Sequence, residues 1–85
     1  SPLADAELAV FRLTDGGALR VGSRGRLVHG DGSPSGLTFE VVVDDATDLP
    51  CMAVTDGGET VRASILGLMV LGWRFAGLGD GEARP

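Results

Sequence analysis

Glycine is the residue that most constrains how this chain can fold. It accounts for 14 of 85 residues, and it separates a series of short apolar runs. Glycine weakens the interior of a helix and supplies the positive φ values that tight turns require. Short apolar runs bounded by such turns are typical of an all-β domain built from antiparallel strands.

The apolar runs predict where the strands lie. The clearest is residues 37–43, in which Leu37, Phe39, Val41 and Val43 share one face, with Thr38 and Glu40 on the other. Thr-Asp-Gly-Gly occurs at residues 14–17 and 55–58, where it predicts two tight turns. The other predicted strands are residues 8–13, residues 18–29 with an interruption near Gly22 and Gly25, and residues 51–54.

Residues 59–75 permit two interpretations. Their apolar density is compatible with a buried helix, but Gly67 and Gly72 would weaken a helix by about 1 kcal/mol each. Leu71, Trp73 and Phe75 alternate with Gly72 and Arg74, which favours two strands with a turn near Gly67. The strands then number about six, and we expect an all-β fold, a small antiparallel barrel that is closed or nearly closed.

The length of the chain indicates one small domain with a modest core. We expect an N-terminal segment at residues 1–7, the barrel at residues 8–78 and a polar, glycine-rich tail at residues 79–85. Pro2 suits the first position of a helix, so residues 2–7 could form a short helical turn.

Composition narrows the classes of partner. All seven basic residues are arginine, and the net charge of −5 argues against broad binding of DNA, RNA or anionic membranes. No apolar run approaches the roughly 20 residues of a membrane-spanning helix, so we expect no membrane insertion. The single cysteine, Cys51, cannot form an internal disulfide, which suits the cytoplasm. We therefore expect a cytoplasmic protein.

Residues 31–36 form the most distinctive polar segment, which fits the pattern D-x-S-x-x-G. Asp31 and Ser33 can each bond nearby backbone N–H groups, and Gly36 supplies a conformation that other residues resist. Such a turn exposes a carboxylate and a hydroxyl at the rim of a sheet, where a planar polar ligand could bind. The alternative is a turn with a purely structural role.

Three arginines precede this turn and form a local basic cluster. Arg20, Arg24 and Arg26 lie within seven residues that contain no acid. Guanidinium groups beside flexible glycines can hold a phosphate. The alternative interpretation is a solvated strand edge.

Two segments together resemble the PilZ family of bacterial cyclic-di-GMP receptors. Residues 31–37 resemble the D/N-x-S-x-x-G signature of that family, and residues 71–78 look like its closing strand. The resemblance covers residues 8–78 and implies a six-stranded antiparallel barrel. It also implies a non-enzymatic signalling module that regulates motility or surface behaviour, with Asp31, Ser33 and Gly36 reading a guanine edge.

The PilZ family also carries an R-x-x-x-R pair that clasps the nucleotide. Arg20 and Arg24 match its spacing, although they follow the first predicted strand instead of preceding it. Two versions of the function follow from the resemblance. In one, Arg20, Arg24 and Arg26 clasp cyclic-di-GMP. In the other, a degenerate PilZ domain binds no nucleotide and acts as a protein-protein adapter.

The remaining motifs have simpler interpretations. The excess of acids also permits a small acidic inhibitor of a basic protein. No nucleophile or acid–base pair stands out, so an enzyme is the least favoured class, and we expect no metal and no cofactor. Asp44, Asp45 and Asp48 are interpreted as a solvated loop. Four apolar residues would form an exposed patch, and so imply a protein partner, if their side chains lay together on the surface: Val42, Met52, Leu68 and Val70.

Overall fold

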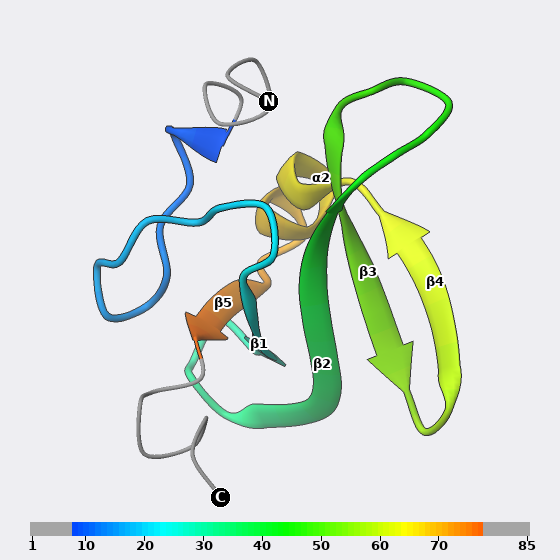
Figure 1. Cartoon of the computed structure of the whole chain (residues 1–85). Helices are drawn as coiled ribbons and strands as arrows, with labels where there is room; N and C mark the ends of the chain where they lie inside the picture. Colours follow the sequence, from blue (N-terminus) through cyan, green and yellow to red (C-terminus); the bar gives the residue numbers. More distant parts are fainter. Residues whose placement is uncertain (1–7, 78–85) are drawn as a thin grey trace, which may run out of the picture.

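The protein folds into one open antiparallel sheet with a short helix. The computed structural model describes residues 8–77. Within them, five strands are ordered β4-β3-β2-β1-β5, and every neighbouring pair is antiparallel (Figure 1). The elements in chain order are β1 (Arg24–Val28), β2 (Pro34–Val43), β3 (Pro50–Asp56), β4 (Glu59–Ala63), α2 (Ile65–Val70) and β5 (Arg74–Gly77).

Strand β2 is the central strand of the sheet and pairs with β1 on one side and β3 on the other. Its ten residues run the length of the molecule, and the strand curves toward β1 (Figure 1). The first part pairs with β1, from Pro34 opposite Val28 to Glu40 opposite Arg24. The second part pairs with β3, from Thr38 opposite Thr55 to Val43 opposite Pro50. Side chains alternate along a strand, so one face of β2 is buried and the other is polar.

The core lies on the face of the sheet that carries Phe39 and Val41. This face confirms the predicted alternation in β2, since both side chains are buried and Thr38 is exposed. The rings of Phe39 and Phe75 meet edge to face, with centroids 5.8 Å apart. The buried apolar side chains are Leu8, Phe11, Leu19, Leu27, Phe39, Val41, Met52, Val54, Ile65 and Phe75.

The predicted six-stranded barrel is wrong for residues 8–77, which form five strands in an open sheet. The predicted first strand, residues 8–13, is instead a turn followed by one isolated bridge between Arg12 and Ala18. The backbone N–H of Phe11 donates to the carbonyl of Leu8, and these two side chains are both buried. Their spacing of three residues fits a turn, so the chain here cannot present the alternating face of a strand.

A second difference lies in residues 65–70, which form α2 where a strand and a turn were predicted. The Ser64 side chain accepts a hydrogen bond from the Gly67 N–H at 3.0 Å and caps the helix. Ile65 is buried against the sheet. Together the cap and this burial outweigh the low helix propensity of Gly67. Of the two strands predicted within residues 59–75, only the outer parts are strand: β4 ends at Ala63 and β5 begins at Arg74, on either side of the helix.

The predicted second strand is shorter than residues 18–29. Gly22 has φ +94° and lies in a turn closed by the Ser23 N–H, which donates to the Arg20 carbonyl. The break near Gly22 is therefore confirmed, and β1 begins only at Arg24. The predicted segments 1–7 and 79–85 lie outside the described residues. Among the residues that are described, no helix has the length and apolar character needed to cross a membrane.

Gly25 lets the backbone of β5 and the ring of Phe39 lie very close to the backbone of β1. A Cβ at this position would lie 2.1 Å from the backbone oxygen of Ala76 and 2.8 Å from the Phe39 ring. We predict that Gly25→Ala lowers the free energy of unfolding by about 3 kcal/mol, because neither the β5 backbone nor the buried ring can move aside cheaply. Urea unfolding followed by Trp73 fluorescence measures this loss.

Gly16→Ala is the matched control. Gly16 has φ +90° and open space around the position of its Cβ, so alanine there costs only about 1 kcal/mol of backbone strain. Equal losses for the two variants would contradict the packing explanation.

Candidate functional site

The turn at residues 31–36, predicted to bind a ligand, connects β1 to β2. Hydrogen bonds to its own side chains close it. The Asp31 carboxylate accepts hydrogen bonds from the Ser33 N–H at 2.9 Å and the Ser33 hydroxyl at 2.7 Å. The Gly32 N–H donates to the His29 carbonyl at 2.8 Å. These hydrogen bonds, that from the Ser33 hydroxyl first, hold the pKa of the Asp31 carboxyl below its ordinary value of 3.8. The two polar side chains of the motif therefore have partners within the turn.

The rest of the motif shapes the start of β2. Gly36 has φ +82°, the left-handed conformation that favours glycine. The Ser35 hydroxyl donates to the Leu27 carbonyl and accepts from the Leu37 N–H at 3.1 Å. These contacts lie beside the point where the β1–β2 register shifts, between Leu27 and Val28. The motif thus forms an irregular but fully bonded entry into the longest strand.

The three predicted arginines have different neighbours, although Arg24 and Arg26 share the exposed face of β1. Arg24 lies at the start of β1 opposite Glu40, with 3.8 Å between its Nε and the Glu40 carboxylate. At about 3.3 Å per residue, Val28 at the far end of β1 is about 13 Å away, and the Asp31 turn begins beyond it. Arg20 precedes β1 and lines a hollow with Arg12. Only Arg26 lies near the motif, in a hollow that it shares with Ser35 and Gly36.

The His29 ring stacks on the ring of Trp73. Its ring centroid lies 4.8 Å from that of Trp73, with the planes tilted by 30°. His29 is exposed and Trp73 is half-buried. The pair joins the β1–β2 turn to the segment between α2 and β5, a contact between residues far apart in the chain. No local pattern in the sequence pointed to it.

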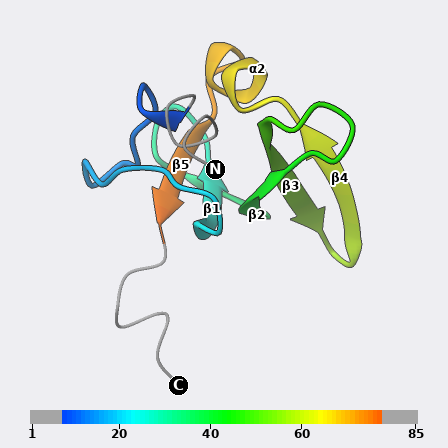
Figure 2. The ribbon, with the colours of Figure 1, turned by 45° about the horizontal axis from the view of Figure 1, so that its top comes forward.

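A hollow of about 450 Å³ opens beside the N-terminal end of α2. Its floor includes the buried side chains of Leu8, Phe11 and Ile65, and Cys51 also lines it. Leu49 on the β2–β3 loop and Leu66 on α2 also line it. Figure 2 shows α2 between this loop and the N-terminal part of the described chain.

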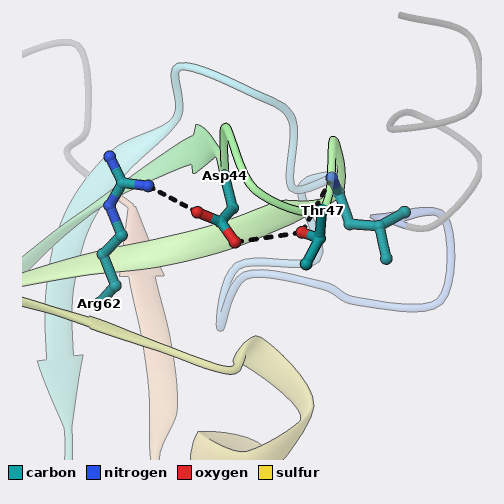
Figure 3. Close-up of polar contacts among 4 residues, drawn as sticks. Asp44, Thr47 and Arg62 are labelled. Carbon is teal, nitrogen blue, oxygen red and sulfur yellow. Dashed lines mark hydrogen bonds and ion pairs between the residues drawn. The ribbon is translucent and has the colours of Figure 1, made fainter.

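An ion pair holds the rim of this hollow in place. The Arg62 guanidinium donates to the Asp44 carboxylate at 2.8 Å, and the Thr47 hydroxyl donates to the other oxygen of that carboxylate at 3.1 Å (Figure 3). The Leu49 N–H in turn donates to the Thr47 hydroxyl at 3.4 Å. Asp44 therefore orders the loop, while Asp45 and Asp48 stay exposed. Among residues 8–77, no group of acids, histidines and cysteine has the arrangement of a metal site.

Exposed apolar side chains gather on α2. We call the four of them the α2 surface: Leu66, Met69, Val70 and Leu71, which are 55%, 45%, 74% and 78% exposed. The predicted apolar patch shares only Val70 with this surface, because Met52 is completely buried and Val42 and Leu68 are half-buried. The sequence signal that could have predicted the α2 surface is the absence of any charged residue between residues 63 and 73.

Comparison of the chain with protein-family models, with curated proteins and with solved structures finds no match. The resemblance to PilZ domains therefore stays a prediction. The function has to be argued from the surfaces that the structure presents.

The Asp31 turn yields a prediction about pH. Since the native pKa of Asp31 is lowered, its contribution to stability is complete above the ordinary pKa and is lost as the pH falls through the native value. We predict that Ser33→Ala raises the pKa of Asp31 toward 3.8, because it removes the hydroxyl donor. Carbon NMR of the carboxyl group across a pH titration measures it.

Ser35→Ala is the control, since the Ser35 hydroxyl bonds the Leu27 carbonyl and not Asp31. An Asp31 pKa that is unchanged in Ser33→Ala, or that rises equally in both variants, would contradict the assignment of the lowered pKa to the Ser33 hydroxyl.

Proposed function

We propose that this domain is a non-enzymatic protein-binding module that docks its partner through the α2 surface. The observation that carries the proposal is the exposure of four large apolar side chains on a six-residue helix and the residue after it. Single exposed apolar residues are ordinary on protein surfaces, but a contiguous group of this kind marks an interaction site. The adapter version of the function predicted from the sequence fits this surface.

The construction of α2 explains why its apolar side chains face outward. Ile65 is buried in the core and Leu68 packs partly against it, so these two residues already attach the helix to the sheet. Leu66, Met69 and Val70 lie on the remaining face. Burying one large apolar side chain contributes about 1.5–3 kcal/mol of free energy. The domain alone leaves these three side chains exposed, so a partner that covers them gains part of this free energy.

The neighbouring hollow adds a place for an anchoring side chain. The exposed side chains of Leu49 and Leu66 line it, together with buried apolar side chains of the core. Interfaces typically concentrate their binding energy in a few side chains that fill such pockets, surrounded by a polar rim. The Asp44–Arg62 pair and Thr47 supply that rim. We infer that an apolar side chain of the partner inserts here while the α2 surface covers its neighbours.

Cyclic-di-GMP binding is the second candidate, and one observation favours it. Arg26 shares a hollow with Ser35 and Gly36, so one predicted clasping arginine lies beside the predicted guanine-reading motif. Arg20 and Arg24 lie elsewhere, and the Asp31 carboxylate is engaged within its own turn. These placements favour the protein-binding module over the nucleotide receptor.

Site-specific photo-crosslinking in the native host cells tests the protein-binding proposal. We predict that a benzoylphenylalanine at position 70 gives one discrete cross-linked adduct. The same residue at position 60 gives none, because Thr60 is exposed on the opposite face of the sheet. The added substitution Leu66→Glu should reduce the adduct at position 70 at least tenfold. Adducts from position 60 alone, or none from position 70, would overturn the proposal.

A calorimetric titration tests the second candidate. We predict no heat of binding for cyclic-di-GMP at tens of micromolar protein, because Arg24 faces the Glu40 carboxylate and the Asp31 carboxylate is engaged by Ser33. Saturable binding that Arg26→Ala and Ser33→Ala abolish, and that Arg62→Ala leaves intact, would instead establish the nucleotide receptor.

A further inference from the structure

A second hollow, of about 370 Å³, lies at the C-terminal end of α2. It is formed by the N-terminal loop, by α2 and by the start of β5. Polar and apolar groups contribute about equally to its walls, and Met69 of the α2 surface belongs to them. The lining residues are Val10, Phe11, Arg12, Leu13, Thr14, Met69, Trp73, Arg74 and Phe75.

The charge of this hollow is opposite to that of the chain. The sequence has 12 acids and seven arginines, yet among residues 8–77 the only charged residues that line the hollow are Arg12 and Arg74. Neither arginine forms an ion pair with any of residues 8–77. Two arginines without an ion-pair partner among residues 8–77 therefore line one hollow together with several apolar side chains, a combination that suits an anion carrying apolar groups.

The Arg12 guanidinium is held in a defined orientation. Its Nη1 donates to the carbonyl of Ala9 at 2.7 Å and to the carbonyl of Phe11 at 2.9 Å. Both bonds use the same nitrogen. The edge formed by Nε and Nη2 remains for another acceptor, and this pair of parallel N–H groups is the geometry that binds a carboxylate bidentately.

Trp73 gives the hollow a fixed aromatic wall. The stacking of its ring on His29 restrains it. Arg74 follows directly in the chain and is exposed on the outer face of β5, opposite Val28 of β1. The hollow is thus lined by one arginine whose guanidinium is held, by a second, exposed arginine and by the ring of Trp73.

We propose that this hollow binds a peptide carboxylate that adjoins an apolar side chain. Arg12 and Arg74 hold the carboxylate, and the apolar side chain packs against Trp73 and Met69. The inference deepens the proposed function, because Met69 is shared with the α2 surface, and it states what the partner segment must carry. An acidic group at this end of α2 also sets the direction in which the partner lies across the helix.

Trp73 is the only tryptophan and lies in the hollow, so its fluorescence reports binding directly. The probe is N-acetyl-phenylalaninate, which joins a carboxylate to an apolar side chain. Its neutral counterpart is N-acetyl-phenylalaninamide, and acetate supplies the carboxylate alone. We expect a saturable change in Trp73 emission with the phenylalaninate in the millimolar range, and binding at least tenfold weaker for the amide and for acetate.

Variants identify the groups responsible. Arg74→Gln and Arg12→Gln should each weaken phenylalaninate binding at least fivefold and leave binding of the amide unchanged. Arg24→Gln is the matched control, since Arg24 lies on the outer face of the sheet in a different hollow, and it should bind like the unmodified protein. Arg74 is exposed and makes no structural bond to the described residues that is comparable to those of Arg12, so its variant tests the site even if Arg12→Gln unfolds.

Equal binding of the phenylalaninate and the amide would overturn the inference, as would a carboxylate preference that survives in Arg74→Gln. The two proposals fail separately. A cross-link from position 70 without any carboxylate preference overturns the carboxylate site alone, and a carboxylate preference without a cross-link overturns the protein-binding module alone.

Discussion

The close approach of Phe39 and β5 to the backbone of Gly25 is the contact on which the rest of the structure depends. It lets the ring of Phe39 lie over β1 and meet Phe75 of β5 at the centre of the core. Because β5 pairs with β1 from Gly25 opposite Gly77 to Val28 opposite Arg74, its position fixes where the chain leaves α2. The direction of α2, the stack of Trp73 on His29 and the hollow beside Arg74 all follow from that placement.

The sequence predicted the features whose causes are local. Side chains alternate along any strand, so the buried face of β2 could be predicted from Leu37, Phe39 and Val41 alone. Hydrogen bonds between Asp31 and Ser33 span two residues, and the D-x-S pattern contains all that they need. The break at Gly22 is local in the same sense, because a positive φ is a property of one residue.

Features that depend on distant residues could not be predicted in this way. The helix at residues 65–70 required both a cap from Ser64 and a sheet against which Ile65 could be buried, and only the first is visible in the sequence. The basic cluster Arg20, Arg24 and Arg26 is compact in sequence, but its members have different neighbours: Arg20 lines a hollow with Arg12, Arg24 faces Glu40, and Arg26 lines a hollow with Ser35. Spacing along the chain could not reveal these neighbours, because they come from other strands and loops.

One short helix links the fold to both proposed binding features. Ile65 attaches it to the core, while Met69 belongs at once to the α2 surface and to the arginine-lined hollow. A partner that covers the α2 surface therefore also reaches this hollow, where it meets Arg12 and Arg74. Apolar burial supplies affinity but little orientation, whereas a carboxylate held by oriented guanidinium groups binds in one direction. The combination explains how a helix of six residues without a charge of its own could select a partner.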